Sequence, residues 1–197
     1  ARQRALEQSE VAIARYPILS EIMSHIGHFQ IRNRGTVGGS IAHADPSAEL
    51  PAFAVAAGAQ VVLQSASSRR EVDAADFFVT YFTTSAETGE MLTEVRLPTQ
   101  ATGWGWGFEE VCRRHGDFAM TGAITRVHLG SDGACDDSRI VIFGVGGTPV
   151  RVESAETALN GSRGDIGSLE TAASAVSDAL DPDSDIHASA LYRKEVS

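Results

Sequence analysis

A segment rich in glycine and tryptophan, Gly103-Trp104-Gly105-Trp106-Gly107, divides the chain into two halves with different hydrophobic patterns. The second half contains three strand-like stretches followed by three helical ones. The strand-like stretches are 106–112, 118–129 and 139–145, and the helical ones are 152–159, 165–180 and 185–196. Strands followed by helices are typical of an α+β unit with separate layers. The order therefore predicts an α+β fold in which residues 104–197 form a three-stranded antiparallel sheet packed on three helices.

The first half begins with helical patterns and continues with strands. Its predicted elements are helices 6–13, 18–26 and 46–58, strands 60–64 and 91–97, a turn at 65–70, and a short helix or loop at 72–82. Asp45 is predicted to be the N-cap of the third helix, because Asp is preferred there and Pro46 suits the first turn. In the second half, Ser131-Asp132-Gly133 predicts a hairpin between two strands.

Composition argues against several classes of partner. The chain has 16 Lys and Arg against 26 Asp and Glu, a net charge of −10, and Lys194 is its single lysine. Binding of nucleic acid or of an anionic membrane surface needs clustered cations, so neither is an expected partner. No apolar run reaches the about 18 residues of a membrane span, so none is expected.

The two cysteines, Cys112 and Cys135, are too few for a four-thiolate zinc or iron–sulfur site. One disulfide between them is possible, but two reduced thiols in a cytoplasmic protein are the favoured interpretation.

Histidines give little sign of catalysis or metal binding. His25 and His28 lie three residues apart near a predicted helix end, but no Cys or carboxylate follows at ligand spacing. They are interpreted as helix-end histidines favoured by the helix dipole, and no metal site is expected. His115 and Asp117 are only two residues apart at the start of a strand, so no catalytic residue is expected in this chain.

The segment from Arg34 to Ser40 is the most informative part of the chain, and it is predicted to be a polar loop between helices. Its three glycines let the backbone approach a ligand closely, and successive free N–H groups in such a turn form an anion-binding nest. Thr36 and Ser40 add hydroxyl groups. The segment matches neither a Walker loop nor a Rossmann fingerprint. From these residues alone, a phosphate site and a plain tight turn both remain open.

The run Ile31-Arg-Asn-Arg-Gly-Thr-Val-Gly-Gly-Ser-Ile-Ala-His-Ala-Asp-Pro46, with Ala48-Glu49-Leu50-Pro51 after it, resembles the second flavin motif of the molybdenum hydroxylase family. It is most similar to the FAD-binding medium subunit of carbon-monoxide-dehydrogenase-type and xanthine-dehydrogenase-type enzymes. Later matching segments are 91–98, 113–119, 144–151 and 185–193. The resemblance implies that residues 1–100 are the second subdomain of a PCMH-type FAD-binding domain. Residues 104–197 then resemble the C-terminal domain of the carbon monoxide dehydrogenase flavoprotein.

The resemblance also implies a set of cofactor-binding residues. In the family, the Thr-Val-Gly-Gly-Ser loop wraps the FAD diphosphate, an acidic residue before Leu-Pro contacts the flavin nucleotide, and an apolar residue of the closing strand packs near the isoalloxazine. The matching positions are Thr36, Val37, Gly38, Gly39, Ser40, Glu49 and Leu92. His43 and Asp45 belong to the same lip. For Asp45 the cap alone is a sufficient role, whereas His43 is either a structural histidine or a flavin neighbour.

Two departures from the family pattern stand out. No Ala-Gly-Gly-type loop for the other side of the diphosphate precedes Thr36, so the chain is expected to be a fragment or one piece of a nicked subunit. Relatives often place a lysine near the flavin ring where this chain has Glu109-Glu110. Two carboxylates there are expected to disfavour a reduced, anionic flavin.

The resemblance implies an FAD-binding electron-transfer subunit of a molybdopterin-dependent hydroxylase or dehydrogenase. A large molybdopterin subunit and a small subunit with two-iron iron–sulfur clusters would complete a hetero-oligomer, and FAD would pass electrons to an external acceptor. One alternative is a non-catalytic assembly or interaction fragment that does not hold flavin by itself. Another is a nucleotide- or phosphate-binding domain unrelated to redox chemistry.

Overall fold

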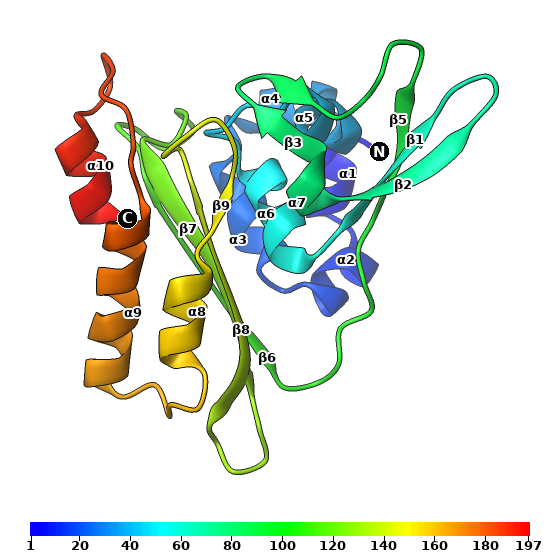
Figure 1. Cartoon of the computed structure of the whole chain (residues 1–197). Coiled ribbons are helices and arrows are strands. Elements are labelled where there is room, and N and C mark those ends of the chain that lie inside the picture. The colour runs from blue at the N-terminus through cyan, green and yellow to red at the C-terminus, as the bar shows by residue number, and fades with distance from the viewer.

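A computed structural model describes residues 1–197 and shows an α+β protein arranged around helix α6 (Glu49–Ala57), as Figure 1 shows. All nine residues of α6 are buried, and the eight residues after Glu49 are apolar, as expected for a helix in the core. The helix packs against helix α3 (Leu19–His25) and against strands β7 (Thr121–Leu129) and β8 (Cys135–Phe143). The predicted fold class is confirmed.

The N-terminal half consists of short helices and a three-stranded antiparallel sheet in the order β2-β1-β5. Its other elements are α1 (Gln3–Glu7), α2 (Glu10–Arg15), α4 (Phe29–Arg34), α5 (Val37–His43), β1 (Gln60–Gln64), β2 (Arg69–Asp73), α7 (Ala74–Phe77), β3 (Phe78–Thr80), β4 (Thr83–Thr84) and β5 (Met91–Arg96). The predicted strands at 60–64 and 91–97 are confirmed. The predicted turn at 65–70 ends earlier, because β2 begins at Arg69.

The C-terminal half is a four-stranded antiparallel sheet in the order β6-β7-β8-β9, followed by three helices. Its remaining elements are β6 (Trp104–Val111), β9 (Val150–Arg151), α8 (Glu153–Leu159), α9 (Ile166–Ala179) and α10 (Ala190–Val196). The three predicted strands and three predicted helices are all present, and the short β9 is an addition. The predicted hairpin is also confirmed, with the Ala134 N–H donating to the Asp132 carboxylate at 3.1 Å. None of the helices combines the length and the apolarity that crossing a bilayer requires.

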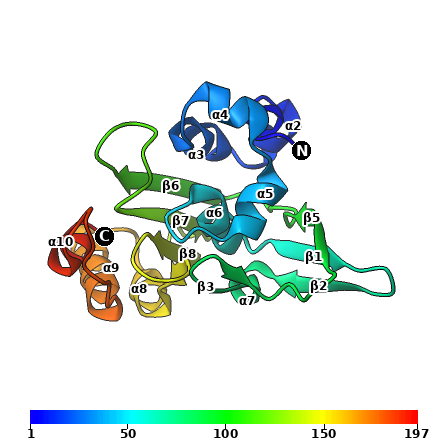
Figure 2. The same cartoon turned by 90° about the horizontal axis from the view of Figure 1, so that it is seen from above.

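Alternate residues of β8 pack into two different hydrophobic cores. Val141 and Phe143 belong to the core around α6, whereas Ile140 and Ile142 pack with α8 and α9. This alternation follows from the two-residue period of a strand. Figure 2 shows the result: α2, α3 and α4 lie on one side of the four-stranded sheet, and α8 and α9 on the other.

Strand β6 begins at Trp104 and therefore includes most of the segment 103–107, where the hydrophobic pattern of the sequence changes. Trp106 forms an edge contact with Tyr16, with ring centroids 5.9 Å apart, on the side of the α6 core. The glycines that alternate with these tryptophans lie on the opposite side of the strand. A Cβ on Gly107 would lie 2.8 Å from Thr125 Oγ1, so a side chain has little room there, whereas a Cβ on Gly105 would meet only the Val127 carbonyl at 3.9 Å.

The C-terminal end of α6 is bonded to the four-stranded sheet by two arginines. Arg139 of β8 donates to the Val55 carbonyl at 3.1 Å, and Arg126 of β7 donates to the Ala57 carbonyl at 3.3 Å. Both carbonyls belong to the last turn of the helix. The Val55 carbonyl also accepts from the N–H of the C-cap residue Gly58 at 3.1 Å, whereas the Ala57 carbonyl has no backbone partner. Arginine from the C-terminal half therefore caps the central helix of the N-terminal half.

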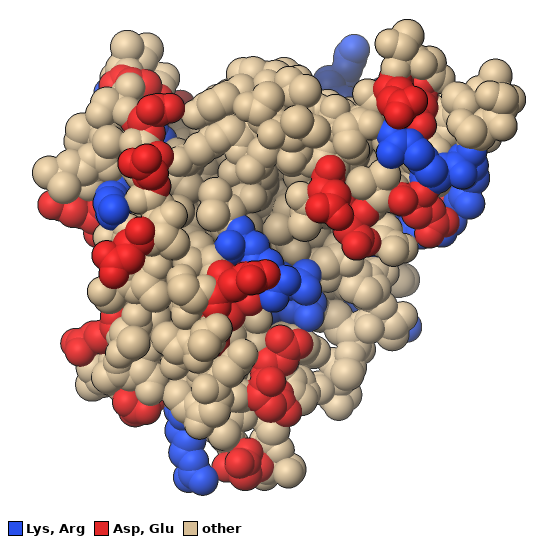
Figure 3. All heavy atoms as spheres, in the orientation of Figure 1, with Lys and Arg blue, Asp and Glu red and all other residues tan.

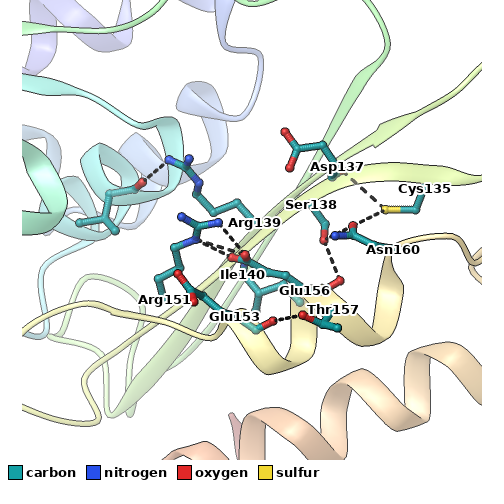
Figure 4. A network of polar contacts seen from close by, with 11 residues as sticks. Cys135, Asp137, Ser138, Arg139, Ile140, Arg151, Glu153, Glu156, Thr157 and Asn160 are labelled. Carbon is teal, nitrogen blue, oxygen red and sulfur yellow. Dashed lines mark hydrogen bonds and ion pairs between the residues drawn. The ribbon is translucent and has the colours of Figure 1, made fainter.

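A polar network joins α8 to the sheet (Figure 4). Glu156, which is 4% exposed, accepts a hydrogen bond from the Ile140 N–H at 3.0 Å and binds the Arg151 guanidinium at 2.7 and 2.9 Å. Ser138 donates to the Glu156 carbonyl at 3.3 Å and to Asn160 Oδ1 at 3.1 Å. Each buried polar group of this network thus has a partner.

Ion pairs cover the outer surface of the β2-β1-β5 sheet. Arg69 and Arg96 bind Glu94 and Glu71 at 2.6–2.9 Å between these strands. Figure 3 shows basic and acidic side chains gathered together at this end of the molecule, and interspersed over the rest of the face that it displays. That face carries no broad area of positive charge.

Candidate functional site

The glycine-rich segment forms the first turn of helix α5, so the prediction of a loop there is wrong. Thr36 is the N-cap, and its hydroxyl oxygen accepts a hydrogen bond from the Gly39 N–H at 3.0 Å. Such a cap stabilises a helix by roughly 1 kcal/mol, which offsets part of the low helix propensity of two glycines. The buried side chain of Ile41 anchors the same helix in the core.

Most backbone N–H groups of this turn already have acceptors within the protein. Val37 N–H donates to the Ala1 carbonyl at 3.0 Å, and Ser40 N–H donates to the Thr36 carbonyl at 3.1 Å. Gly39 N–H is held by the cap, which leaves the N–H groups of Thr36 and Gly38 without an acceptor. The predicted nest of several free amides is therefore reduced to two amides and the nearby hydroxyls.

The structure explains the glycines at positions 38 and 39 in different ways. A Cβ on Gly39 would lie 2.6 Å from Thr36 Oγ1, so the cap itself excludes a side chain there. A Cβ on Gly38 would meet only the flexible end of Leu92, at 3.3 Å. Neither glycine has a positive φ. The fold therefore requires glycine at 39, whereas glycine at 38 keeps the backbone open to close approach by a ligand.

Two cavities adjoin α5, and Thr36 and Gly39 line both of them. The polar cavity has a volume of about 630 Å³, and its wall also includes Ser40, His43, Asp45 and Glu49. The apolar cavity has a volume of about 650 Å³, and its wall also includes Val37, Gly38, Leu50, Phe53 and Leu92. The structure thus brings all nine predicted site residues to two adjoining cavities, each within the size range of small-molecule sites.

Glu49 gives the polar cavity an unusual group. The residue is 6% exposed, and burial raises the pKa of its carboxyl to about 8, with smaller contributions from the nearby carboxylates of Glu110 and Asp45. At neutral pH Glu49 is therefore a neutral acid that can donate a hydrogen bond. His43 lies on the same wall, with its ring centroid 5.1 Å from that of Phe82.

Asp45 does not cap helix α6, contrary to the prediction. Its carboxylate accepts a hydrogen bond from the Ser47 N–H at 2.9 Å, which closes a local turn, and α6 begins only at Glu49 after Ala48. The Pro46 carbonyl in this turn accepts from the Gly144 N–H at 2.9 Å. Asp side chains often form such turns in competition with helix formation. The helix therefore begins three residues later than predicted.

Residues 1–100 match the family model of the FAD binding domain in molybdopterin dehydrogenase. Residues 106–197 match that of the CO dehydrogenase flavoprotein C-terminal domain. The chain belongs to this family of molybdopterin dehydrogenase flavoproteins.

Relatives of this flavoprotein family match along nearly the whole chain. The 6-hydroxypseudooxynicotine dehydrogenase complex subunit alpha of Paenarthrobacter nicotinovorans is 41% identical over 99% of this chain and 66% of that protein. The carbon monoxide dehydrogenase medium chain of Afipia carboxidovorans is 34% identical over 98% of this chain and 67% of its own length. A solved carbon monoxide dehydrogenase from Hydrogenophaga pseudoflava superposes with a TM-score of 0.95 at 35% identity, covering 100% of this chain and 68% of that one. The flavoprotein chain thus spans about two thirds of the length of these relatives.

Several residues that shape the site were not singled out from the sequence. Arg32, 8% exposed, binds the Glu7 carboxylate at 2.9 and 3.1 Å and donates to the carbonyls of Ile26 and Gly27 at 3.0 and 3.1 Å. It thereby fixes the corner that forms part of the polar cavity wall. The sequence around Arg32 is polar, so no pattern distinguishes it from an exposed arginine.

The polar cavity adjoins a third cavity of about 690 Å³. The two share Asp45, Gly116, Asp117 and the 68% exposed Phe118, and the wall of the third cavity also includes three arginines. These are Arg113, Arg114 and Arg193.

Proposed function

We propose that this chain is the FAD-binding electron-transfer part of a molybdopterin-dependent hydroxylase or dehydrogenase. The observation that carries the proposal is the meeting of all nine predicted residues at two cavities that share Thr36 and Gly39. A polar cavity beside an apolar one suits a ligand that combines an anionic group with a flat, apolar ring system. FAD has this composition, and it supplies the redox chemistry when bound.

Each part of the site has a role in this proposal. The Gly38 N–H and the hydroxyls of Thr36 and Ser40 donate hydrogen bonds to the diphosphate. The neutral acid of Glu49 donates to the nucleotide, and an acid without charge repels the diphosphate less than a carboxylate would. Leu92 and Val37 provide the apolar surface for the isoalloxazine ring. His43 and Asp45 complete the lip.

The partners follow from the chemistry and from the relatives. One relative is named as a subunit of a dehydrogenase complex, and another as a medium chain. We propose that a large molybdopterin subunit and a small iron–sulfur subunit join this chain in a cytoplasmic hetero-oligomer. Electrons then reach FAD from the iron–sulfur clusters and leave to an external acceptor.

The alternative is a chain that serves assembly and holds no flavin by itself. One specific observation favours it: only the N–H groups of Thr36 and Gly38 lack an acceptor in the glycine-rich turn. Two backbone donors and two hydroxyls supply fewer charge-assisted hydrogen bonds than the nest predicted from the glycines. Flavin absorbance of the purified chain after incubation with FAD distinguishes the two functions.

The two glycines provide the test of the site. Gly38→Ala adds a methyl group without disturbing the cap and favours the helix by roughly 0.5–1 kcal/mol. We expect this variant to be at least as stable as the wild type and to bind FAD at least about tenfold more weakly. Gly39→Ala is the matched control, in which stability and binding should fall together because the cap is lost. Unchanged FAD affinity in Gly38→Ala contradicts the assignment of the diphosphate to this turn.

A further inference from the structure

The polar cavity has two ends of different character. Its wall shares Thr36 and Gly39 with the apolar cavity, and it shares Asp45 and Asp117 with the third cavity. The glycine-rich turn therefore forms one end of the polar cavity, and the two aspartates belong to the other. Arg34, two residues before the turn, is the only arginine or lysine in this wall. A chain with a net charge of −10 thus presents a single fixed positive charge to a ligand in this cavity.

Arg34 and Arg32 lie in the last turn of the same helix, α4, but they are bonded differently. Arg32 is buried, and its donors are used by the Glu7 carboxylate and by two backbone carbonyls. Arg34 is exposed, and its guanidinium has no hydrogen-bond or ion-pair partner in the chain. The five N–H donors of its planar fork are therefore available to a ligand. Arg32 fixes the corner of the cavity, whereas the side chain of Arg34 makes no bond that holds the fold.

The N-terminal residues hold the backbone of Arg34 beside the turn. Residues 1–3 pair in antiparallel with residues 35–37 through two backbone hydrogen bonds of 2.9 and 3.0 Å. The Arg2 guanidinium donates to the Arg34 carbonyl and has no carboxylate partner. This pairing fixes the backbone from which the Arg34 side chain extends, and it brings a second positive charge close to the turn. Both charges make the electrostatic potential at this end of the cavity more favourable for an anion.

The free donors of the turn do not match the charge of a diphosphate. Only the N–H groups of Thr36 and Gly38 and two hydroxyls are available, and none of them carries a full charge. The carboxylates of Asp45 and Asp117 at the other end repel an anion. An anionic group is therefore favoured at the turn, where a guanidinium can bind two of its oxygens at once.

Resting on the proposed function, we propose that Arg34 is a further ligand-binding residue, whose guanidinium binds the diphosphate and fixes the direction of the ligand in the polar cavity. The anionic group lies at the Arg34 end. The hydroxyl and amino groups of the nucleoside lie towards Asp45 and Asp117, whose carboxylates accept hydrogen bonds. The turn then supplies a surface that the diphosphate can approach closely, and the arginine supplies the charge that neutralises it.

Inorganic pyrophosphate tests the anion site without FAD. Its affinity is measured by isothermal titration calorimetry for the wild type, Arg34→Gln and Arg15→Gln. We expect Arg34→Gln to bind pyrophosphate about tenfold more weakly and to lose affinity less steeply as salt is raised, because one charged contact is gone. Arg15 is the matched control, since it is also exposed at the end of a short helix but is not part of the cavity wall. Equal affinities in the wild type and Arg34→Gln, or no binding by the wild type at low salt, overturn the proposal.

Arg34→Lys separates the charge from the shape of the side chain. Lysine keeps the positive charge but loses the planar fork, so we expect pyrophosphate to bind about threefold more weakly, with the salt dependence of the wild type. The melting temperatures of all these variants should equal that of the wild type, because the Arg34 guanidinium has no partner in the fold. A loss of affinity accompanied by a clear loss of stability would mean that Arg34 supports the fold, and it would overturn the proposal.

FAD binding separates this inference from the proposed function. We expect Arg34→Gln to bind FAD about tenfold more weakly than the wild type, as it binds pyrophosphate. A wild type that binds pyrophosphate through Arg34 but does not bind FAD defeats the proposed function and leaves the anion site established. Equal FAD affinities in the wild type and Arg34→Gln overturn the assignment of the diphosphate to Arg34.

Discussion

Two buried polar groupings in this molecule differ in how completely they are satisfied. In the network between α8 and β8, Glu156 has a backbone amide and a guanidinium as donors (Figure 4). Between α3 and β6, the buried side chain of Glu110 lies 3.7 Å from His25 Nδ1, and neither of its oxygens has a hydrogen-bond donor. Both groupings contain a deeply buried glutamate, so burial by itself does not distinguish them.

The difference teaches what each glutamate can do. A buried carboxylate with a full set of donors stabilises the fold, because the donors replace the water that it has lost. A buried carboxyl without donors costs stability, and burial raises the pKa of Glu110. The α8–β8 network therefore stabilises the fold, whereas the buried carboxyl of Glu110 destabilises it.

The largest expected effect concerns the satisfied network. Glu156→Ala leaves the Arg151 guanidinium and the buried Ile140 N–H without their acceptor. We expect a loss of about 3–5 kcal/mol in the free energy of unfolding, measured by urea denaturation. Glu153→Ala, on the exposed face of the same helix, is the control and should change stability by less than about 0.5 kcal/mol. Similar losses in the two variants contradict the comparison.

The next effect concerns the buried carboxyl of Glu49 and has the opposite sign. The pKa of Glu49 is raised from 4.5 in the unfolded chain to about 8, so its contribution is fully present below pH 4.5 and is lost as pH rises towards 8. Glu49→Gln stays neutral and escapes this loss. At pH 8 we expect the variant to be more stable than the wild type by roughly 2–4 kcal/mol, with little difference at pH 4.5. Equal pH profiles of unfolding for the two proteins would show that Glu49 is ionised in the fold.

A smaller effect is expected for a neutral member of the network. Ser138 is 2% exposed and donates to the Glu156 carbonyl and to Asn160. Ser138→Ala removes those bonds but leaves no charge unpaired, so a loss of about 1–2 kcal/mol is expected in thermal unfolding. A loss as large as that of Glu156→Ala would mean that the hydroxyl, and not the ion pair, holds the network together.

The smallest effect is expected at the exposed ion pairs of the β2-β1-β5 sheet. Glu94 binds Arg69 and Arg96, and the three side chains are 42–47% exposed. Water and salt screen such pairs. Glu94→Gln should leave the melting temperature unchanged within error at physiological salt. A clear drop in the melting temperature would mean that these exposed ion pairs stabilise the fold as the buried network does.

Much of the fold could be predicted because its elements follow simple periods. The strands at 60–64 and 91–97, the hairpin at 131–133 and the helices of the C-terminal half all agree with the structure in kind. Strand β2 was missed because its Arg-Arg-Glu-Val-Asp sequence is charged and belongs to a half-exposed edge. Helix α5 was missed because two adjacent glycines oppose a helix, whereas the Thr36 cap and the burial of Ile41 outweigh that preference.

The candidate site could be predicted as a set of residues but not as a geometry. All nine predicted residues line the two cavities, whereas the loss of free amides depends on the geometry of the helix start. Thr36 accepts from the Gly39 and Ser40 amides, and Ala1, which is distant in sequence, accepts from the Val37 amide. The sequence did contain a signal for the burial of Glu110. Trp106, Phe108 and Glu110 alternate along β6, so the two-residue period places Glu110 on the inner face of the strand.

The two arginines that bind the end of α6 have a consequence for how the chain opens. Arg126 and Arg139 of the C-terminal sheet donate to the carbonyls of Ala57 and Val55. The end of α6 therefore cannot unwind without breaking hydrogen bonds to the C-terminal half. We expect the amides of α6 to exchange their hydrogens only when the whole chain unfolds, at the rate of the central strands β7 and β8. The two family segments then behave as one cooperative folding unit, and a destabilising change in either is felt in the other.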